Sequence, residues 1–308
     1  MKSVTIKLAV LGALSFISMQ SMATGLVAIP TTGFTSSAYT SCNTTGNFGS
    51  SIPTLPTTTA NNTCAVFPTS ESADPTGAGY TLAASKTRSA TINGVTVGYV
   101  LDRVWRNAAK TSCIFGARFT AYDADWDPDT AGTQYFEVND IARAGFGSLS
   151  VNAGYYIQAT NASPVYRIGR TFTSVQHRAY KYDTATNKAL LGTNYLDLPT
   201  KNSVTSNLSG EATGINATTV ASTSSTTQDA VVNSNWIDFT LDSGYLDDDG
   251  GTNVNSAMTY VEAACDDSAI SGWEKAGAIR LRQTGQEATT MQEITLDLGY
   301  APPGATVP

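Results

Sequence analysis

The alternation of apolar and polar residues most constrains what this chain can fold into, because a period of two places every second side chain on one face of a β-strand. In the segment 113–122 the apolar positions are Cys113, Phe115, Ala117, Phe119 and Ala121. Arg118 and Thr120 alternate with them. The same spacing recurs in segments 95–101, 237–241, 279–281 and 294–298. These segments are predicted to be separate strands, each with one face in the core.

Turn signals separate the expected strands. Asn93-Gly94 stands between two such segments, and this pair favours a type I′ hairpin because both of its central residues need positive φ. Helical patterns are scarce: residues 139–145 and 268–275 could each form a turn or two behind a polar cap. We therefore predict an all-β fold, an antiparallel β-sandwich or jelly roll with at least ten strands and long irregular loops.

The first 23 residues have the composition of a secretory signal peptide. Lys2 and Lys7 precede a short apolar run, and Ser21-Met22-Ala23 supplies small residues at the −3 and −1 positions of a cleavage site. The apolar run is shorter than the roughly 20 residues that a membrane span needs. We expect an exported protein of the bacterial periplasm, cell surface or medium, with no membrane insertion of the mature chain.

Charge and composition narrow the class of partner and suggest the domain organisation. The formal net charge is −7, with 25 acidic and 18 basic residues, which argues against a nucleic-acid partner. Residues 24–76 are rich in Thr, Ser and Pro and are expected to form an N-terminal arm. Residues 77–308 are expected to form one β-sandwich domain with a polar loop at 201–229.

The four cysteines are Cys42, Cys64, Cys113 and Cys265, and an even number in an exported chain predicts two disulfides. Three connectivities are open. We favour Cys42 with Cys64, which bracket a Thr/Pro/Asn-rich segment, and Cys113 with Cys265. Strand parity points both thiols of the second pair into the core, so this bond is expected to join the two sheets.

An acidic loop is the sharpest candidate for a metal site. Its alternating carboxylates and a following glutamate are Asp123, Asp125, Asp127, Asp129 and Glu137. Ca²⁺ prefers several hard oxygen ligands, and alternating Asp residues in a tight loop deliver them to one point. The spacing departs from the usual calcium loop, however, because Thr130 stands where Gly is expected. The alternative is a solvated acidic turn between two strands.

Basic and aromatic residues suggest a second candidate site. Arg167 and Arg170 lie in segment 166–178, which gathers three arginines and the only histidine of an otherwise acidic chain, and Arg170 shares its parity with apolar neighbours. An inward Arg is expected to need a carboxylate partner, which would make it structural. The functional alternative is a pocket for an anion such as a sugar acid. Trp126 could line a sugar platform, although an aromatic residue in a β protein more often packs in the core.

No catalytic motif is present. The chain has one histidine, His177, and no nucleophile elbow or zinc-binding helix, so the familiar hydrolase machineries are disfavoured. The first hypothesis is an exported, non-enzymatic structural or adhesin-like protein, calcium-stabilised and able to assemble with itself by strand addition. The alternative is a secreted carbohydrate-binding or carbohydrate-active jelly roll, whose partner would be a surface glycan.

Overall fold

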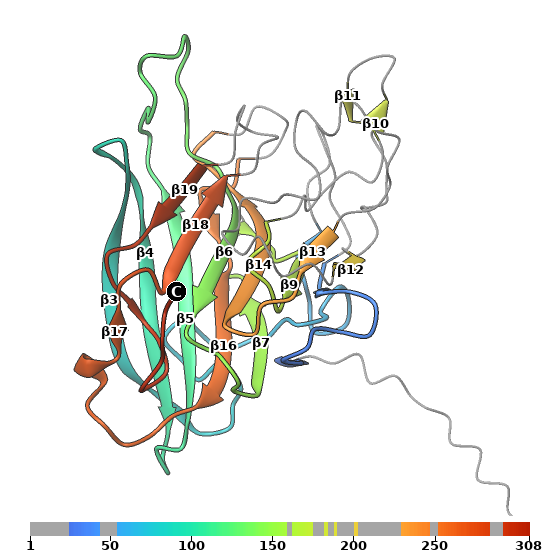
Figure 1. The fold of residues 1–308 in the computed structure, drawn as a ribbon, viewed down its shortest axis with the longest axis vertical. Coiled ribbons are helices and arrows are strands. Elements are labelled where there is room, and N and C mark those ends of the chain that lie inside the picture. Colours follow the sequence, from blue (N-terminus) through green and yellow to red (C-terminus); the bar gives the residue numbers. More distant parts are fainter. Residues whose placement is uncertain are drawn as a thin grey trace, which may run out of the picture.

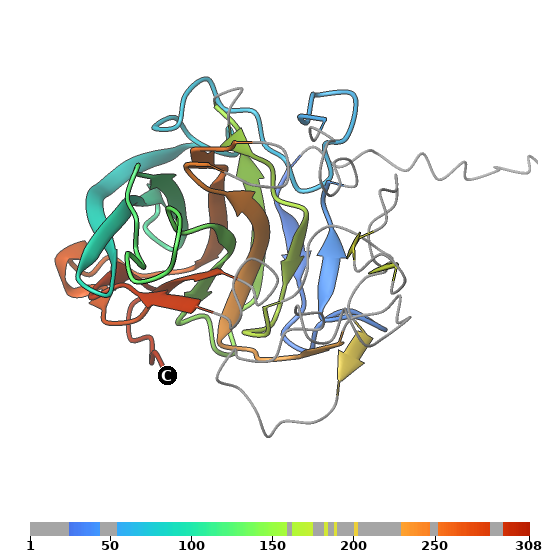
Figure 2. The same cartoon turned by 90° about the horizontal axis from the view of Figure 1, so that it is seen from above.

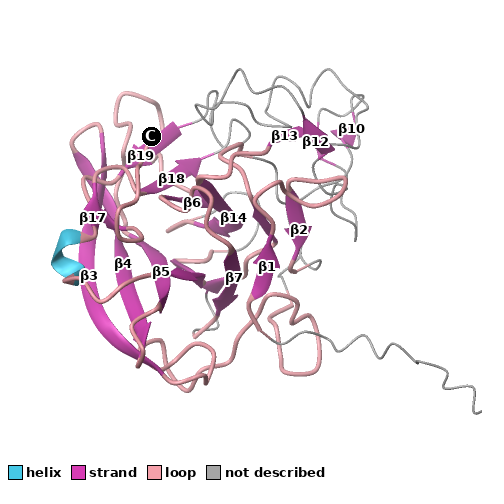
Figure 3. Cartoon of the chain, turned by 60° about the horizontal axis from the view of Figure 1, so that its bottom comes forward, coloured by secondary structure: helices cyan, strands magenta, loops and turns pink. Residues whose placement is uncertain are grey.

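A computed structural model describes residues 25–43, 54–158, 162–174, 182–183, 188–189, 200–202, 229–246, 252–283 and 292–308. The predicted signal peptide, most of the predicted polar loop at 201–229 and His177 lie outside these residues. Nearly all the regular structure is β, as predicted, and the helical structure described is a single 3₁₀ turn, η1 (Ile270–Gly272), drawn in cyan in Figure 3. No described helix is long and apolar enough to cross a membrane.

The larger of two main sheets has eight strands. Six of them lie side by side in the order β1 (Val27–Ile29), β7 (Val151–Tyr156), β16 (Met258–Ala264), β5 (Ser112–Ala121), β4 (Val95–Asn107) and β3 (Tyr80–Ile92). Near its end β5 also pairs with β15 (Asn255–Ser256), which in turn pairs with β8 (Ala162–Ser163) in parallel. This sheet curves into a half-barrel rather than a flat layer (Figures 1 and 2).

The smaller main sheet has six antiparallel strands. Their order is β19 (Gln292–Thr295), β18 (Ile279–Gln283), β6 (Val138–Ala144), β14 (Trp236–Ser243), β9 (Arg167–Gly169) and β2 (Tyr39–Ser41). Three short pairs complete the described strands: β10 (Tyr182–Asp183) with β11 (Lys188–Ala189), β12 (Thr200–Asn202) with β13 (Asp229–Val231), and β17 (Glu274–Lys275) with β20 (Gly299–Tyr300).

The hydrophobic core lies between the facing sides of the two main sheets. In one cluster, Phe115 and Val261 of the large sheet pack with Ile168 and Phe239 of the small sheet, and all four are fully buried. A neighbouring cluster extends this core towards β3 and β19. Burial of a side chain of this size stabilises the fold by about 1.5–3 kcal/mol. The alternation identified the core faces of 113–121, 237–241 and 279–281 correctly. In 95–101 it was wrong from Tyr99 onwards, because Val100 rather than Tyr99 or Leu101 lies in this core, and Leu298 at the end of 294–298 is 44 % exposed.

Local sequence signals predict one hairpin turn correctly and one helical turn wrongly. Asn93 and Gly94 adopt φ values of 51° and 80°, and Ile92 pairs with Val95, so the predicted hairpin is confirmed as the β3–β4 connection. The helical turn predicted at 139–145 is wrong, because these residues belong to β6. That strand lies in the middle of the small sheet and is buried on both faces, so tertiary packing overrides the local capping pattern.

Both predicted disulfides are present, but their roles differ from the expectation. Cys113 and Cys265 join neighbouring strands of the large sheet, since Ala263 of β16 is the register partner of Cys113 in β5. The prediction that this bond joins the two sheets is therefore wrong. The Cys42–Cys64 bond does so: Cys42 follows β2 of the small sheet, and the carbonyl of Cys64 accepts the N–H of Tyr155 in β7 of the large sheet.

The N-terminal segment contributes to both sheets. β1 pairs with β7 at one edge of the large sheet, and β2 pairs with β9 at one edge of the small sheet. Ala38 and Tyr39 are fully buried. The described part of residues 24–76 is thus integrated into the fold.

Candidate functional site

The carboxylates of the acidic loop serve mainly to shape the loop. Oδ1 of Asp125 accepts the backbone N–H groups of Asp127 and Gln134 at 3.2 and 3.1 Å, and Oδ2 of Asp127 accepts the Thr130 hydroxyl at 2.7 Å. Asp129 is exposed. Within the described residues, no three acidic, His or Cys side chains gather in a way that could hold a metal ion. Calcium binding here stays a prediction.

Glu137 lies apart from the hydrogen bonds of that loop. It is 5 % exposed, its Oε1 accepts the side-chain amide of Asn139 at 2.7 Å, and it packs beside Gly244 at the end of β14. The structure therefore places this carboxylate at the start of β6, in the body of the fold, whereas Asp123 and Asp129 are on the surface.

Trp126 packs in the core. It is 8 % exposed and makes an edge-to-face contact with Phe136 at a centroid distance of 6.4 Å. Trp105, Trp236 and Trp273 are at most 2 % exposed. No tryptophan of this chain offers an open ring face for a sugar in this structure.

Arg170 is inward, as its parity predicts, but its partners are not carboxylates. Its Nη2 donates to the carbonyls of Phe146, Gly147 and Leu149 at 3.4, 2.8 and 3.0 Å, which fixes the turn between β6 and β7. Burial lowers its pKa to about 10. The expected carboxylate partner is thus replaced, in the part of the chain described, by backbone oxygens.

Arg167 and Trp126 do not join Arg170 in one pocket. Arg167 is 3 % exposed and belongs to β9, beside Thr240. Trp126 lies in the core cluster that contains Val138, the first residue of β6, whereas Arg170 binds the turn after the last residue of that strand. A seven-residue strand spans about 20 Å, so the two side chains lie near opposite ends of the small sheet.

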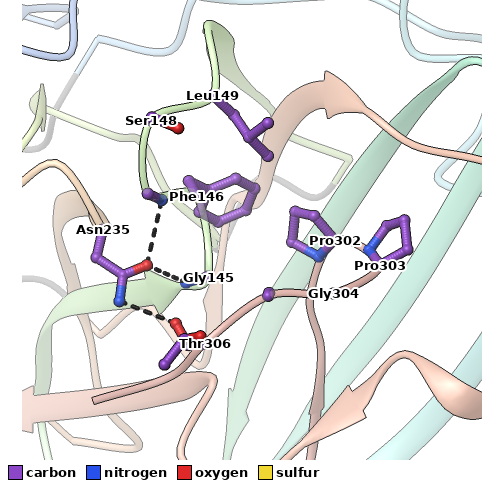
Figure 4. Close-up of a pocket in the computed structure, with 11 residues that line it drawn as sticks. Gly145, Phe146, Ser148, Leu149, Asn235, Pro302, Pro303, Gly304 and Thr306 are labelled. Carbon is purple, nitrogen blue, oxygen red and sulfur yellow. Dashed lines mark hydrogen bonds between the residues drawn. The ribbon is translucent and has the colours of Figure 1, made fainter.

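A pocket of about 430 Å³ lies beside that same turn (Figure 4). Its wall consists of residues 145–149, Asn235 and residues 302–306. Oδ1 of Asn235 accepts the N–H groups of Gly145 and Gly147, and its Nδ2 donates to the carbonyl of Thr306 at 3.0 Å. Gly145 has φ of 99°, which explains the glycine there. The lining residues carry no titratable side chain, so the pocket offers no acid–base chemistry.

A charged cluster is buried on the side of the small sheet that faces away from the core. It comprises Tyr39 of β2, Asp140 of β6, Asp238 of β14, Arg282 of β18 and Ser174, all fully buried. Arg282 pairs with both carboxyl groups, through Nε to Asp140 at 2.5 Å and through Nη2 to Asp238 at 3.0 Å. Burial and the adjacent Asp140 raise the pKa of Asp238 well above its usual range. Paired carboxyl groups are a common catalytic device, but this pair is sealed from solvent and from substrate.

Four partly or fully exposed tyrosines and an aspartate lie near the end of β5 and the start of β6. We call this group the tyrosine surface and define it as Tyr99, Tyr122, Asp123, Tyr135 and Tyr245. The rings of Tyr99 and Tyr122 are 5.9 Å apart, and those of Tyr135 and Tyr245 are 5.3 Å apart. The chain between β5 and β6, green at the top of Figure 1, carries three of these five residues.

Asp123 links the two tyrosine pairs. It follows Tyr122 in the chain, and desolvation together with the nearby Asp123 carboxylate raises the pKa of Tyr135. Tyr122 is 46 % exposed, and Leu246, next to Tyr245, is 56 % exposed. The surface thus combines two pairs of tyrosine rings, their hydroxyl groups and a carboxylate near the end of β5.

Comparison of the chain with protein-family models, with curated proteins and with solved structures found no match. The geometry alone therefore has to support a functional assignment.

Sequence reasoning missed both the buried cluster and the tyrosine surface. Alternation did place Arg282 opposite Leu281, on the side away from the core, but no pattern shows that this side is also buried. The tyrosines lie in three separate segments of the chain and outside any motif. Only the pairing of β14 with β6 brings Tyr245 beside Tyr135.

Proposed function

We propose that this protein is an exported, non-enzymatic, adhesin-like β protein that binds a ligand at the cell surface or in the periplasm. Two disulfides indicate an oxidising, exported environment. The buried carboxyl pair is inaccessible to substrate, and the pocket beside the β6–β7 turn has no acid–base groups in its wall. Both observations favour binding over catalysis. We also regard the curved large sheet and the small sheet as a distorted sandwich.

The tyrosine surface is the observation that carries this proposal, and a glycan is the ligand class that suits it. Tyrosine presents an apolar ring face on which the C–H side of a sugar can stack, together with a hydroxyl that can donate and accept hydrogen bonds. A neighbouring carboxylate such as Asp123 accepts hydrogen bonds from sugar hydroxyls. The carbohydrate-binding alternative predicted from the sequence is thus retained, but on tyrosines rather than on Trp126.

Self-assembly by strand addition has weaker support. The segments that could have been donated to a neighbour, around β1, β2 and β19, are already paired within the chain. Along the free edge of β3 the structure has two register shifts and side chains such as Lys86 and Arg88 that reach to Glu274. Bulges and inward charges of this kind oppose edge-to-edge pairing. We therefore expect a monomer.

A glycan array probed with the labelled, oxidised mature chain tests the proposal. We expect binding to a restricted set of glycans, its loss in Tyr122→Ala, and its retention in Phe67→Ala, which removes another exposed aromatic ring outside the tyrosine surface. Mass spectrometry of the recovered glycan should show it unchanged. Cleavage of the glycan would contradict the non-enzymatic assignment, and binding that survives Tyr122→Ala would contradict the site.

A further inference from the structure

The hydrogen bonds of Tyr39 define the protonation state of the buried cluster. The Tyr39 hydroxyl lies 2.6 Å from the carbonyl oxygen of Thr173 and also contacts Oδ2 of Asp238. A hydroxyl has one proton to donate, and a carbonyl oxygen can only accept. If Tyr39 donates to Thr173, the contact with Asp238 needs a proton from the aspartate. If Asp238 were ionised, the single hydroxyl proton of Tyr39 could serve only one of these two contacts. The other contact would then join two oxygens with no proton between them.

The charges of the cluster balance only with that proton. Both oxygens of Asp140 accept, Oδ1 from Arg282 and Oδ2 from the Ser174 hydroxyl, so Asp140 is the ionised partner of the arginine. Oδ1 of Asp238 accepts from Nη2 of Arg282 at 3.0 Å, which leaves only Oδ2 to carry a proton. Two ionised carboxylates beside one arginine would leave a net negative charge in a fully buried site, which is costly.

Among the described residues, no other cation on this side of the sheet pairs with Asp238. Arg280 of β18 pairs with Glu293 at 2.9 Å and lies over the rings of Phe172 and Trp236. Arg167 and Asp242 belong to the same side of the sheet, but within the described part of the chain Asp238 forms an ion pair with Arg282 alone, and its other neighbours are Tyr39 and Asp140. Burial and the Asp140 carboxylate both disfavour ionisation of Asp238.

We propose that Asp238 is a buried proton-binding site that stays protonated in the folded protein at neutral pH and contributes stability that is lost as the pH rises. The sign follows from linkage. In the unfolded chain Asp238 ionises near pH 3.9, whereas in the fold it keeps its proton to a higher pH. Between these two values the folded state binds more protons. The contribution of Asp238 to stability is therefore fully present at low pH and is lost as the pH rises through its folded-state pKa.

Equilibrium urea unfolding of the oxidised chain at pH values from 5 to 8 tests this claim, with Asp238→Asn as the variant. Asn reproduces the hydrogen bonds of a neutral acid, because its oxygen accepts from Arg282 and its amide donates to Tyr39. We expect the unfolding equilibrium constant of the wild type, relative to the variant, to rise up to tenfold per pH unit within that window. Asp140→Asn is the matched control, and we expect it to be destabilised at every pH because it removes the counter-charge of Arg282.

Infrared spectroscopy provides a second readout, and its decisive measurement needs only the folded wild type. The folded wild type at pH 7 should show the C=O band of a protonated carboxyl group, and Asp238→Asn should lack it. Two results would overturn the proposal: no such band in the wild type at pH 7, or parallel pH profiles of stability for the wild type and Asp238→Asn.

Discussion

The two partners of an ion pair between the sheets should differ sharply in what their removal costs. Arg143 of β6 and Asp102 of β4 are fully buried, and Nη2 of Arg143 lies 3.3 Å from Asp102 and 2.6 Å from the carbonyl oxygen of Tyr300. Asp102 has better partners: Nε of Arg88 at 2.7 Å and the backbone N–H of Tyr300 at 2.8 Å. Nε and Nη1 of Arg143 have no partner among the described residues. Arg143 is therefore the poorly satisfied member of the pair.

The magnitudes follow from this asymmetry. Arg143→Met gives up one long ion-pair contact and the hydrogen bond to the Tyr300 carbonyl, but it also removes two unsatisfied donors, each of which costs about 1–3 kcal/mol when buried. Because these terms oppose each other, we expect a change in the free energy of unfolding within about 1 kcal/mol. Asp102→Asn leaves Arg143 buried without a counter-charge and weakens the pairing of Arg88. Breaking a buried pair in this way costs about 3–5 kcal/mol.

Urea unfolding of the two variants at pH 7, followed by far-ultraviolet circular dichroism, measures both changes. The predicted order is that Arg143→Met unfolds near the wild-type midpoint and Asp102→Asn at a much lower urea concentration. If Arg143→Met proves the more damaging of the two, the reasoning from unsatisfied donors is refuted.

Three further outcomes follow from the fold. Loss of the Cys113–Cys265 bond, whose cysteines are 152 positions apart, should destabilise the protein by about 5 kcal/mol. Loss of the Cys42–Cys64 bond, whose cysteines are 22 positions apart, should cost about 3 kcal/mol because the loop it closes is shorter. Equal urea midpoints for the two double-Ala variants would contradict chain entropy as the cause. Gly98→Ala would place a Cβ 2.3 Å from the Thr120 carbonyl oxygen and should lower the melting temperature by several degrees. Gly272→Ala is the control, because its Cβ meets no atom within 4 Å and the melting temperature should stay unchanged. Similar melting temperatures for the two variants would refute the packing argument. If the acidic loop 123–129 binds calcium, EDTA should lower the melting temperature, and an unchanged value would remove that prediction.

Regular alternation and short-range turn chemistry made much of this fold predictable. The face that contains Phe115 and Phe119 and the Asn93-Gly94 hairpin follow from local pattern, because both depend on neighbours in sequence. The order of the strands in the sheets does not follow from local pattern. Nothing local places β5 beside β16, so the parity of Cys113 and Cys265 gave the correct bond with the wrong role.

The functional residues were harder to predict because they depend on burial and on long-range pairing. Trp126 and Arg170 are predicted as ligand-binding residues because of their residue types. In the structure Trp126 packs in the core, and Arg170 binds the backbone of a turn. The alternation around Ile237 and Phe239 predicts that Asp238 faces solvent. In the structure the outer side of the small sheet is also buried, and this burial alters the protonation of Asp238. The tyrosine surface depends on contacts such as Tyr135 with Tyr245, which lie 110 positions apart.

The most direct test of the account is a calorimetric titration of the mature chain with the best glycan from the array, repeated with Tyr122→Ala, Asp123→Asn and Phe67→Ala. The account predicts that Tyr122→Ala and Asp123→Asn each weaken binding by about tenfold or more, equivalent to at least about 1.4 kcal/mol, and that Phe67→Ala binds as the wild type does. Equal affinities for the wild type and Tyr122→Ala, or no heat with any glycan, would contradict a glycan-binding role for the tyrosine surface.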